Sequence, residues 1–335
     1  MVNKRFFINS LTNFLKQRNP FSKRILILTN LIYPHRLIRR LKHNKSKRFN
    51  LKYFINDIPN HKSGVNIEFD RNNPDKSFKF AEQKLREHGA VVIENYFSEN
   101  LLKSFKQYFL NEINQIKKNE SVISRPLKLS YPLLDLWANK ELIKFISNYF
   151  GENIFFRSYP RLQYVDNNSN VENSSSKKNI AYAWHIDHAS VMNQFIYLSE
   201  ISKNGTLMEI VSGSHLMPLN TSLKFSNSSV IEKNYQTKKL YGPEGSVQLH
   251  DPNVLHRALP VKGSDRLSFY SEYSWGENIL FDINYVNDMF NKSHIHLEQL
   301  EDYQRNLMRG IFPKTPFSGY QIEGQFIKPQ VDNSI

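Results

Sequence analysis

The feature that most constrains this fold is a run of short strand-like segments in the second half of the chain. The segments are rich in aromatic and β-branched residues, and Gly, Asn, Pro and Ser lie between them, which is typical of strands joined by turns. Several short strands at such spacing favour a β-sandwich or barrel over a parallel sheet. The expected strands are Ile154–Val165, Tyr182–Asp187, Gln194–Leu198, Thr206–Val211, Ser246–His250 and Leu267–Tyr273.

The region before these strands predicts helices around one short apolar strand. Gly89 and Gly151 each follow a helical pattern, as expected of residues that end helices. Ser98 stands where a side chain would cap the start of another helix. The pattern therefore predicts a mainly β protein with flanking helices. The expected elements are helices over Phe78–His88, Glu99 to about Lys118 and Asn139–Phe150, with a strand over Ala90–Glu94.

The net charge of +14 is concentrated in an N-terminal arm. Residues 1–50 contain 13 Lys and Arg and no acidic residue, whereas the rest of the chain holds 32 basic and 31 acidic side chains. A basic stripe across a folded domain would argue for nucleic acid. A basic arm on a neutral body is a weaker and different signal. With its apolar helical stripes it predicts a tether to an anionic membrane surface or to a partner, and a solubilising tail is the alternative.

We divide the chain into this basic amphipathic arm, residues 1–50, and a single domain, residues 51–335. The core of the domain spans about 75–280, and a C-terminal extension, 281–335, includes one further helical pattern over Leu297–Arg309. The most apolar segment of the arm, Ile25–Tyr33, is shorter than the 20 or so residues of a bilayer span. We expect a cytoplasmic protein that is peripheral at a membrane surface through its arm.

The chain contains no cysteine. This excludes disulfide frameworks, thiolate zinc sites, iron–sulfur clusters and a cysteine nucleophile. Any bound metal must therefore be held by nitrogen and oxygen ligands.

A candidate metal site begins in the segment YAWHIDH. Side chains alternate along a strand, so His185 and Asp187 point the same way. His256, in the apolar run VLHRAL, would complete the two-His, one-carboxylate triad of non-haem iron oxygenases, which leaves positions open for a keto acid and dioxygen. His250 is the rival second histidine, but it does not lie ten residues before Arg266, as His256 does.

A candidate anion clamp follows in the segment RLSFYSEY. Arg266, Ser268 and Tyr270 share one face of this expected strand. A guanidinium binds a carboxylate with two parallel hydrogen bonds, and a serine hydroxyl nearby adds another. Metal ligands and anion clamp thus occur in the order that chemistry with a keto acid requires.

These stretches resemble the phytanoyl-CoA dioxygenase family of Fe(II)- and 2-oxoglutarate-dependent oxygenases. The likeness covers roughly residues 75–280 and leaves out the arm and the tail. It implies a double-stranded β-helix, a cupin-like jelly roll, with helices packed outside. The matching segments are HGAVVIE (88–94), WHIDH (184–188), NGTLMEIVSGSH (204–215), GSVQLHDPNVLH (245–256) and SDRLSF (264–269).

The resemblance also implies residue roles. Arg266 would bind the distal carboxylate of 2-oxoglutarate, and Gln163 matches a position that contacts this cosubstrate. Ala258 departs from the family pattern, in which a hydroxyl residue often stands two after the second histidine, so cosubstrate binding is expected to rely more on Arg266 and Ser268. The catalytic residues and Fe(II) ligands would be His185, Asp187 and His256.

The expected activity is hydroxylation of an unidentified small-molecule or lipid-like substrate, with O2 as second cosubstrate and with succinate and CO2 as products. Asp187 supports hydroxylation, since iron halogenases replace this carboxylate by a small residue. A polar segment, Asp166–Asn179, is expected to act as a lid over the site. Two alternatives stay open: a non-catalytic jelly-roll binding protein, and an oxygenase recruited to nucleic acid by its basic arm.

Overall fold

The computed structural model describes a large part of the chain beyond its basic arm. The arm, residues 1–50, and the expected lid, residues 166–179, lie outside the described residues. None of the described helices has both the length and the hydrophobicity needed to cross a bilayer. The described residues are 60–117, 123–151, 154–156, 160–165, 183–187, 191–216, 224–225, 231–233, 235–274, 295, 299–308, 321–322 and 325–326.

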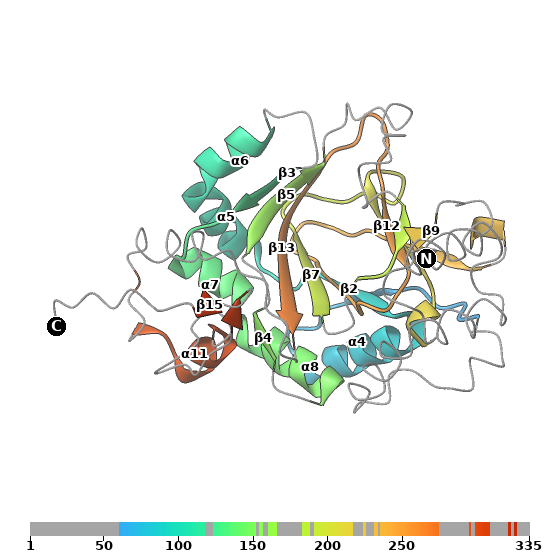
Figure 1. Cartoon of the computed structure of the whole chain (residues 1–335), viewed down its shortest axis with the longest axis horizontal. Coiled ribbons are helices and arrows are strands. Elements are labelled where there is room, and N and C mark those ends of the chain that lie inside the picture. Colours follow the sequence, from blue (N-terminus) through green and yellow to red (C-terminus); the bar gives the residue numbers. More distant parts are fainter. Residues whose placement is uncertain are drawn as a thin grey trace, which may run out of the picture.

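Two β-sheets form the body of the domain (Figure 1). The larger sheet has the strand order β1 (Asn66–Glu68), β2 (Ala90–Glu94), β11 (Val247–His250), β7 (Val191–Tyr197), β13 (Arg266–Ser274), β5 (Arg161–Val165) and β3 (Ile123–Pro126), and β4 (Phe155–Phe156) also pairs with β13. The smaller sheet has the order β10 (Thr237–Leu240), β8 (Leu207–Val211), β12 (His256–Leu259), β6 (Trp184–His185) and β9 (Lys224–Phe225). A separate hairpin pairs β14 (Gln321–Ile322) with β15 (Gln325–Phe326).

The chain crosses repeatedly between the two main sheets. From β5 to β8, and again from β10 to β13, each strand lies in the opposite sheet from the strand before it. All pairings among these strands are antiparallel. Two antiparallel sheets connected in this way form a jelly roll. The predicted fold class, mainly β with flanking helices around a jelly-roll core, is thereby confirmed.

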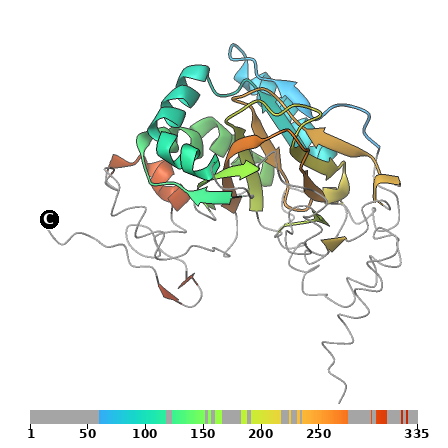
Figure 2. The ribbon, with the colours of Figure 1, turned by 90° about the horizontal axis from the view of Figure 1, so that it is seen from above.

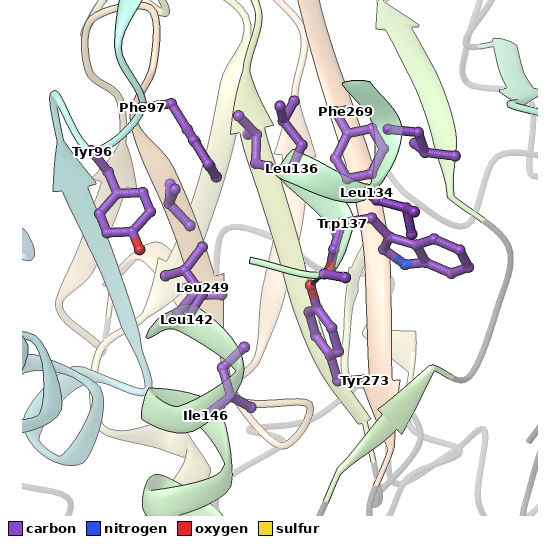
Figure 3. Close-up of a cluster of buried hydrophobic side chains, with 14 of the residues drawn as sticks. Tyr96, Phe97, Leu134, Leu136, Trp137, Leu142, Ile146, Leu249, Phe269 and Tyr273 are labelled. Atoms are coloured by element: carbon purple, nitrogen blue, oxygen red, sulfur yellow. Dashed lines mark hydrogen bonds between the residues drawn. The ribbon is translucent and has the colours of Figure 1, made fainter. Parts of the chain in front are cut away.

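Helices cover the outer face of the larger sheet (Figure 2). A large hydrophobic core lies between them, in which Trp137 and Ile146 from the helices pack near Leu249, Phe269 and Tyr273 from the strands (Figure 3). Full burial of one such side chain contributes roughly 1.5–3 kcal/mol to folding. The helices are α4 (Pro74–His88), α5 (Glu99–Tyr108), α6 (Leu110–Lys117), α7 (Tyr131–Trp137) and α8 (Lys140–Phe150).

A second, smaller core lies between the two sheets. Phe195 and Tyr197 of β7 belong to it together with Met208 and Ile210 of β8, whereas Ile196 of β7 belongs to the helix-facing core. Because side chains alternate along a strand, β7 is buried on both faces. The larger sheet is therefore packed on both faces, and this packing restricts the side chains on its inner face.

The boundaries of three predicted elements need correction. The first helix begins at Pro74 because the side chain of Asn73 accepts a hydrogen bond from the Lys76 amide and caps it. The helix expected from Glu99 to Lys118 is interrupted at Phe109, whose φ of −100° departs from helical geometry. The strand expected over 154–165 is split into β4 and β5, with Pro160, which has no N–H for a strand ladder, just before β5.

Several elements were not predicted. Helix α7 follows Ser130, whose hydroxyl accepts from the Leu133 amide. Strand β1 pairs in parallel with β2, so the sheet begins before residue 75, where the core was expected to start. In the tail, α11 (Asp302–Met308) lies within the expected helix, and the Tyr303 hydroxyl donates to the Ala138 carbonyl. This part of the C-terminal extension therefore packs on the domain.

Two glycines that end helices offer a matched stability test. Gly89 and Gly151 both adopt left-handed φ values, +80° and +67°. A Cβ on Gly89 would lie 2.6 Å from His215 Nδ1 and 2.8 Å from Val254 Cγ2, whereas a Cβ on Gly151 would meet nothing within 4 Å. Gly151→Ala should therefore lower the free energy of unfolding by roughly 1–2 kcal/mol, the cost of a left-handed alanine.

Gly89→Ala should lower the free energy of unfolding by about 1–3 kcal/mol more than Gly151→Ala does, because overpacking adds to the same backbone cost. Urea denaturation of both variants measures the difference. An equal loss in the two variants would show that the packing of Gly89 against His215 and Val254 is looser than described.

Candidate metal centre

Three potential metal ligands meet at the centre of the smaller sheet. His185 of β6 lies directly opposite His256 of β12 in the antiparallel register, with ring centroids 4.3 Å apart. Asp187 follows two residues after His185, and one ligand atom from each of the three side chains lies within 4.8 Å of the others. Nε2 of His256 is 3.3 Å from Asp187 Oδ2, and Nε2 of His185 is 3.8 Å from Asp187 Oδ1.

Backbone carbonyl groups orient both imidazole rings. Nδ1 of His185 is 2.7 Å from the Ala183 oxygen, and Nδ1 of His256 is 3.0 Å from the Val254 oxygen. A carbonyl can only accept, so each Nδ1 carries the proton and each Nε2 presents its lone pair to the centre. This is the usual way in which metal-binding histidines are fixed in one tautomer.

The electrostatics of the three groups suit a cation. Burial alone would raise the pKa of Asp187, but the imidazoles of His256, His250 and His185 hold this pKa well below its usual range, so the carboxylate is ionised. Burial lowers the pKa of His256, which keeps that ring neutral near pH 7. Two imidazole nitrogens and one carboxylate oxygen are a donor set for a divalent transition metal.

A cavity of about 130 Å³ opens beside the triad. The three clustered side chains differ in exposure: 33% of the Asp187 side chain and 13% of the His185 side chain are exposed, but only 4% of the His256 side chain. The open side of the site is therefore the side of β6. The lining residues are Arg161, Gln163, His185, Asp187, Asn193, Phe195, Met208, His250, His256, Ala258, Arg266 and Tyr270.

Two of the three predicted cosubstrate residues line this cavity. Arg266 is 3% exposed, and its Nη2 donates to Gln163 Oε1 at 3.4 Å. Its guanidinium lies 5.6 Å from the centroid of the Phe195 ring. Ser268 pairs with Gln163 across β13 and β5 and is fully buried, but it is not among the described lining residues. The structure thus brings Arg266 and Gln163 to the cavity, and Ser268 lies buried beside Gln163 on the neighbouring strand.

His250, the rival second histidine, lies close to the triad without joining it. Its Nε2 is 3.9 Å from Asp187 Oδ2, but it is also 2.9 Å from the amide nitrogen of Asn193. Its Nδ1 is 3.2 Å from the amide nitrogen of Gln248. Both ring nitrogens thus lie within hydrogen-bond distance of a neighbouring amide, and the metal-ligand cluster among the described residues contains His256 instead.

Sequence reasoning did not assign a role to Asn193, Arg161 or Phe195, all of which line the cavity. The signal that would have found them is the two-residue alternation along β5 and β7. Arg161 and Gln163 share one face of β5, as Asn193 and Phe195 share one face of β7. Tyr270, placed on the face of Arg266 by the sequence, does line the cavity.

Comparisons with known proteins find likeness only among solved structures. No model of a known protein family matches the chain, and no curated protein matches it. The likeness to the phytanoyl-CoA dioxygenase family is therefore not confirmed. AviO1 from Streptomyces viridochromogenes Tue57 is 18% identical, with a TM-score of 0.44, and the match covers 62% of this chain and 95% of AviO1.

Two further solved structures are described as dependent on, or bound to, the same keto acid. The alpha ketoglutarate dependent epimerase SnoN from nogalamycin biosynthesis is 14% identical, with a TM-score of 0.45, over 60% of this chain and 84% of SnoN. HygX from Streptomyces hygroscopicus, with nickel and 2-oxoglutarate bound, is 16% identical, with a TM-score of 0.43, over 57% of this chain and 85% of HygX. With TM-scores below 0.5, these likenesses do not decide the function of this chain.

Replacement of any of the three clustered side chains should abolish tight metal binding. His185→Ala, Asp187→Ala and His256→Ala should each weaken Co²⁺ binding by more than about 100-fold, since even partners of the ligands contribute 10–100-fold to metal affinity. His250→Ala is the matched control and should keep Co²⁺ binding. Titration followed by visible absorption measures this. Retained binding in His256→Ala, together with lost binding in His250→Ala, would show that the second histidine was wrongly chosen.

Proposed function

We propose that this chain is an Fe(II)- and 2-oxoglutarate-dependent dioxygenase that hydroxylates a small-molecule or lipid-like substrate and releases succinate and CO2. One observation carries the proposal: the His185, Asp187 and His256 cluster opens on the same cavity whose wall carries the buried guanidinium of Arg266. Metal ligands and a carboxylate-binding group thus face one small space from the two sheets.

The residues fit iron and a keto acid. Two histidines and one carboxylate are the protein ligands of non-haem Fe(II) oxygenases, and they leave coordination positions for a chelating cosubstrate and dioxygen. Bound iron and 2-oxoglutarate would supply the activation of dioxygen and the oxidation of a C–H bond. The task of the protein is to bind, to orient and to exclude water.

Arg266 and its neighbours would hold the far end of the cosubstrate. A guanidinium binds a carboxylate with two parallel hydrogen bonds, and these are strong in a buried site. Gln163 accepts from Nη2 and helps to fix the guanidinium, while Phe195 packs beneath it. The cavity of about 130 Å³ is lined by the three clustered side chains and by Arg266. The substrate would then approach from the open side, next to His185 and Asp187.

Turnover of 2-oxoglutarate tests the proposal. The full chain with Fe(II) under air should convert 2-oxoglutarate to succinate, and Arg266→Ala should raise the concentration required for half-maximal rate. Loss of a buried charge-assisted pair costs roughly 2–5 kcal/mol, which corresponds to a 30-fold or greater rise at about 1.4 kcal/mol per tenfold. Co²⁺ binding by this variant should stay within about twofold of the original chain.

Arg257→Ala is the matched control for this experiment. Arg257 lies on the same sheet as His256 but pairs with Glu209 and stacks on Trp184, and it does not line the cavity among the described residues. Its removal should lower stability and leave the 2-oxoglutarate requirement unchanged. An unchanged requirement in Arg266→Ala would reject the cosubstrate role of Arg266, and absence of succinate with the original chain would favour the non-catalytic binding protein.

The N-terminal arm extends the proposal beyond the described residues. We propose that residues 1–50 tether the oxygenase domain, residues 51–335, to an anionic membrane surface. Thirteen basic residues without an acidic one support this, since each contributes up to about 1 kcal/mol near such a surface. Recruitment to nucleic acid by the same arm is the competing proposal.

A further inference from the structure

Asn193 occupies the middle of the inner face of the larger sheet. It lies on β7, directly opposite His250 of β11 on one side and Glu272 of β13 on the other. The residue is 2% exposed and lines the cavity next to Asp187. A buried amide needs a partner for each of its donors and acceptors, because an unsatisfied group costs about 1–3 kcal/mol. Its hydrogen bonds therefore indicate its role.

Both the nitrogen and the oxygen of this amide have hydrogen-bonding partners. The nitrogen donates to Oδ2 of Asp187 and lies 2.9 Å from Nε2 of His250, while the oxygen accepts from the Tyr270 hydroxyl at 2.9 Å. An ionised carboxylate can only accept, so the amide nitrogen must face Asp187 and the amide oxygen must face Tyr270. The carboxylate of Asp187 thus dictates the orientation of Asn193, and the Tyr270 hydroxyl is compatible with it.

We propose that Asn193 is a positioning residue for the metal ligand Asp187. By binding Oδ2 it would fix the rotamer of the carboxylate and leave Oδ1 as the oxygen for the ion. The same amide nitrogen faces the lone pair of His250 Nε2, which accounts for the position of His250 beside the cluster and outside it. The proposal rests on the proposed function only in taking the triad as a metal site.

Tyr270 would fix Asn193 in turn. Burial and the neighbouring carboxylate of Glu272 hold the pKa of Tyr270 well above its usual value, so the phenol stays a hydrogen-bond donor. The single proton of its hydroxyl lies between two acceptors, Asn193 Oδ1 and the Glu272 carboxylate. Glu272 pairs with Arg161, whose guanidinium lies 4.4 Å from the centroid of the Tyr270 ring. The carboxylate of Asp187 is thus connected through Asn193 to a network on the rigid sheet.

The test measures Co²⁺ binding by the full chain without cosubstrate. Asn193→Leu keeps the approximate side-chain volume and removes both donors. It should weaken Co²⁺ binding about 10–100-fold, as loss of a hydrogen bond to a metal ligand does, and should change the visible spectrum of bound Co²⁺. Tyr270→Phe should shift affinity and spectrum in the same direction by a smaller factor.

Tyr273→Phe is the matched control. Tyr273 is a buried tyrosine on the same strand, but its hydroxyl donates to the Trp137 carbonyl on the helix-facing side of the sheet. Its loss should lower the melting temperature and leave Co²⁺ affinity and spectrum unchanged. If Asn193 had only a structural role, Asn193→Leu would likewise lower the melting temperature and leave Co²⁺ affinity and spectrum unchanged.

The proposal would be overturned if Asn193→Leu folds, binds Co²⁺ with an affinity within twofold of that of the unsubstituted protein, and gives an unchanged spectrum. If that variant does not fold, equal Co²⁺ affinities in Tyr270→Phe and Tyr273→Phe would overturn it. An original chain that binds Co²⁺ but forms no succinate would reject the oxygenase and leave this inference standing. No Co²⁺ binding by the original chain would reject both.

Discussion

The site depends on the pairing of a very short strand, β6, with β12. This pairing places His185 directly opposite His256, so both imidazoles lie on one face of the smaller sheet. Asp187 lies just beyond β6, where its backbone N–H donates to the Pro252 carbonyl in the loop before β12. The ligand cluster is therefore held by the backbone of two neighbouring segments, and its geometry depends on the register of the smaller sheet.

The larger sheet makes this arrangement rigid. Helices pack on its outer face and the smaller sheet packs on its inner face, so strands such as β7 and β13 contribute to two cores. Towards the site, polar side chains replace the apolar ones of the inner core. Asn193, Gln248 and His250 stand on β7 and β11 where a fully apolar interior would have hydrophobic residues. Such buried polar groups persist because each has a hydrogen-bonding partner.

The fold class and the three clustered residues could be predicted from the sequence, because the two-residue alternation of strands and the apolar pattern of helices were visible in it. The two-residue alternation around His185 and Asp187 indicated a shared face, whereas the strand that carries His256 was not among the expected strands. The strand Ala90–Glu94 and the glycines that end α4 and α8 were predicted at their observed positions. These features are local, so a short window of sequence contains the information.

What the sequence did not predict depends on contacts between distant segments. The sequence favoured His256 over His250 on spacing alone, whereas in the structure the pairing of β12 with β6 places His256 opposite His185, and Asn193 lies against His250 Nε2. Ser268 was expected at the cosubstrate, yet it is fully buried beside Gln163 on the neighbouring strand and is not among the described residues that line the cavity. Strand β1 was missed because its three residues gain stability only by pairing with β2.

The central claim is that one metal ion and one molecule of 2-oxoglutarate bind together in the cavity between His185 and Arg266. An anaerobic titration of the Fe(II)-loaded chain with 2-oxoglutarate, followed by visible absorption, tests this most directly. Chelation of Fe(II) by the keto acid should produce a new charge-transfer band that saturates at one equivalent per chain and is absent with succinate, which has no keto group. Fe(II) binding without any band that depends on 2-oxoglutarate would contradict the claim.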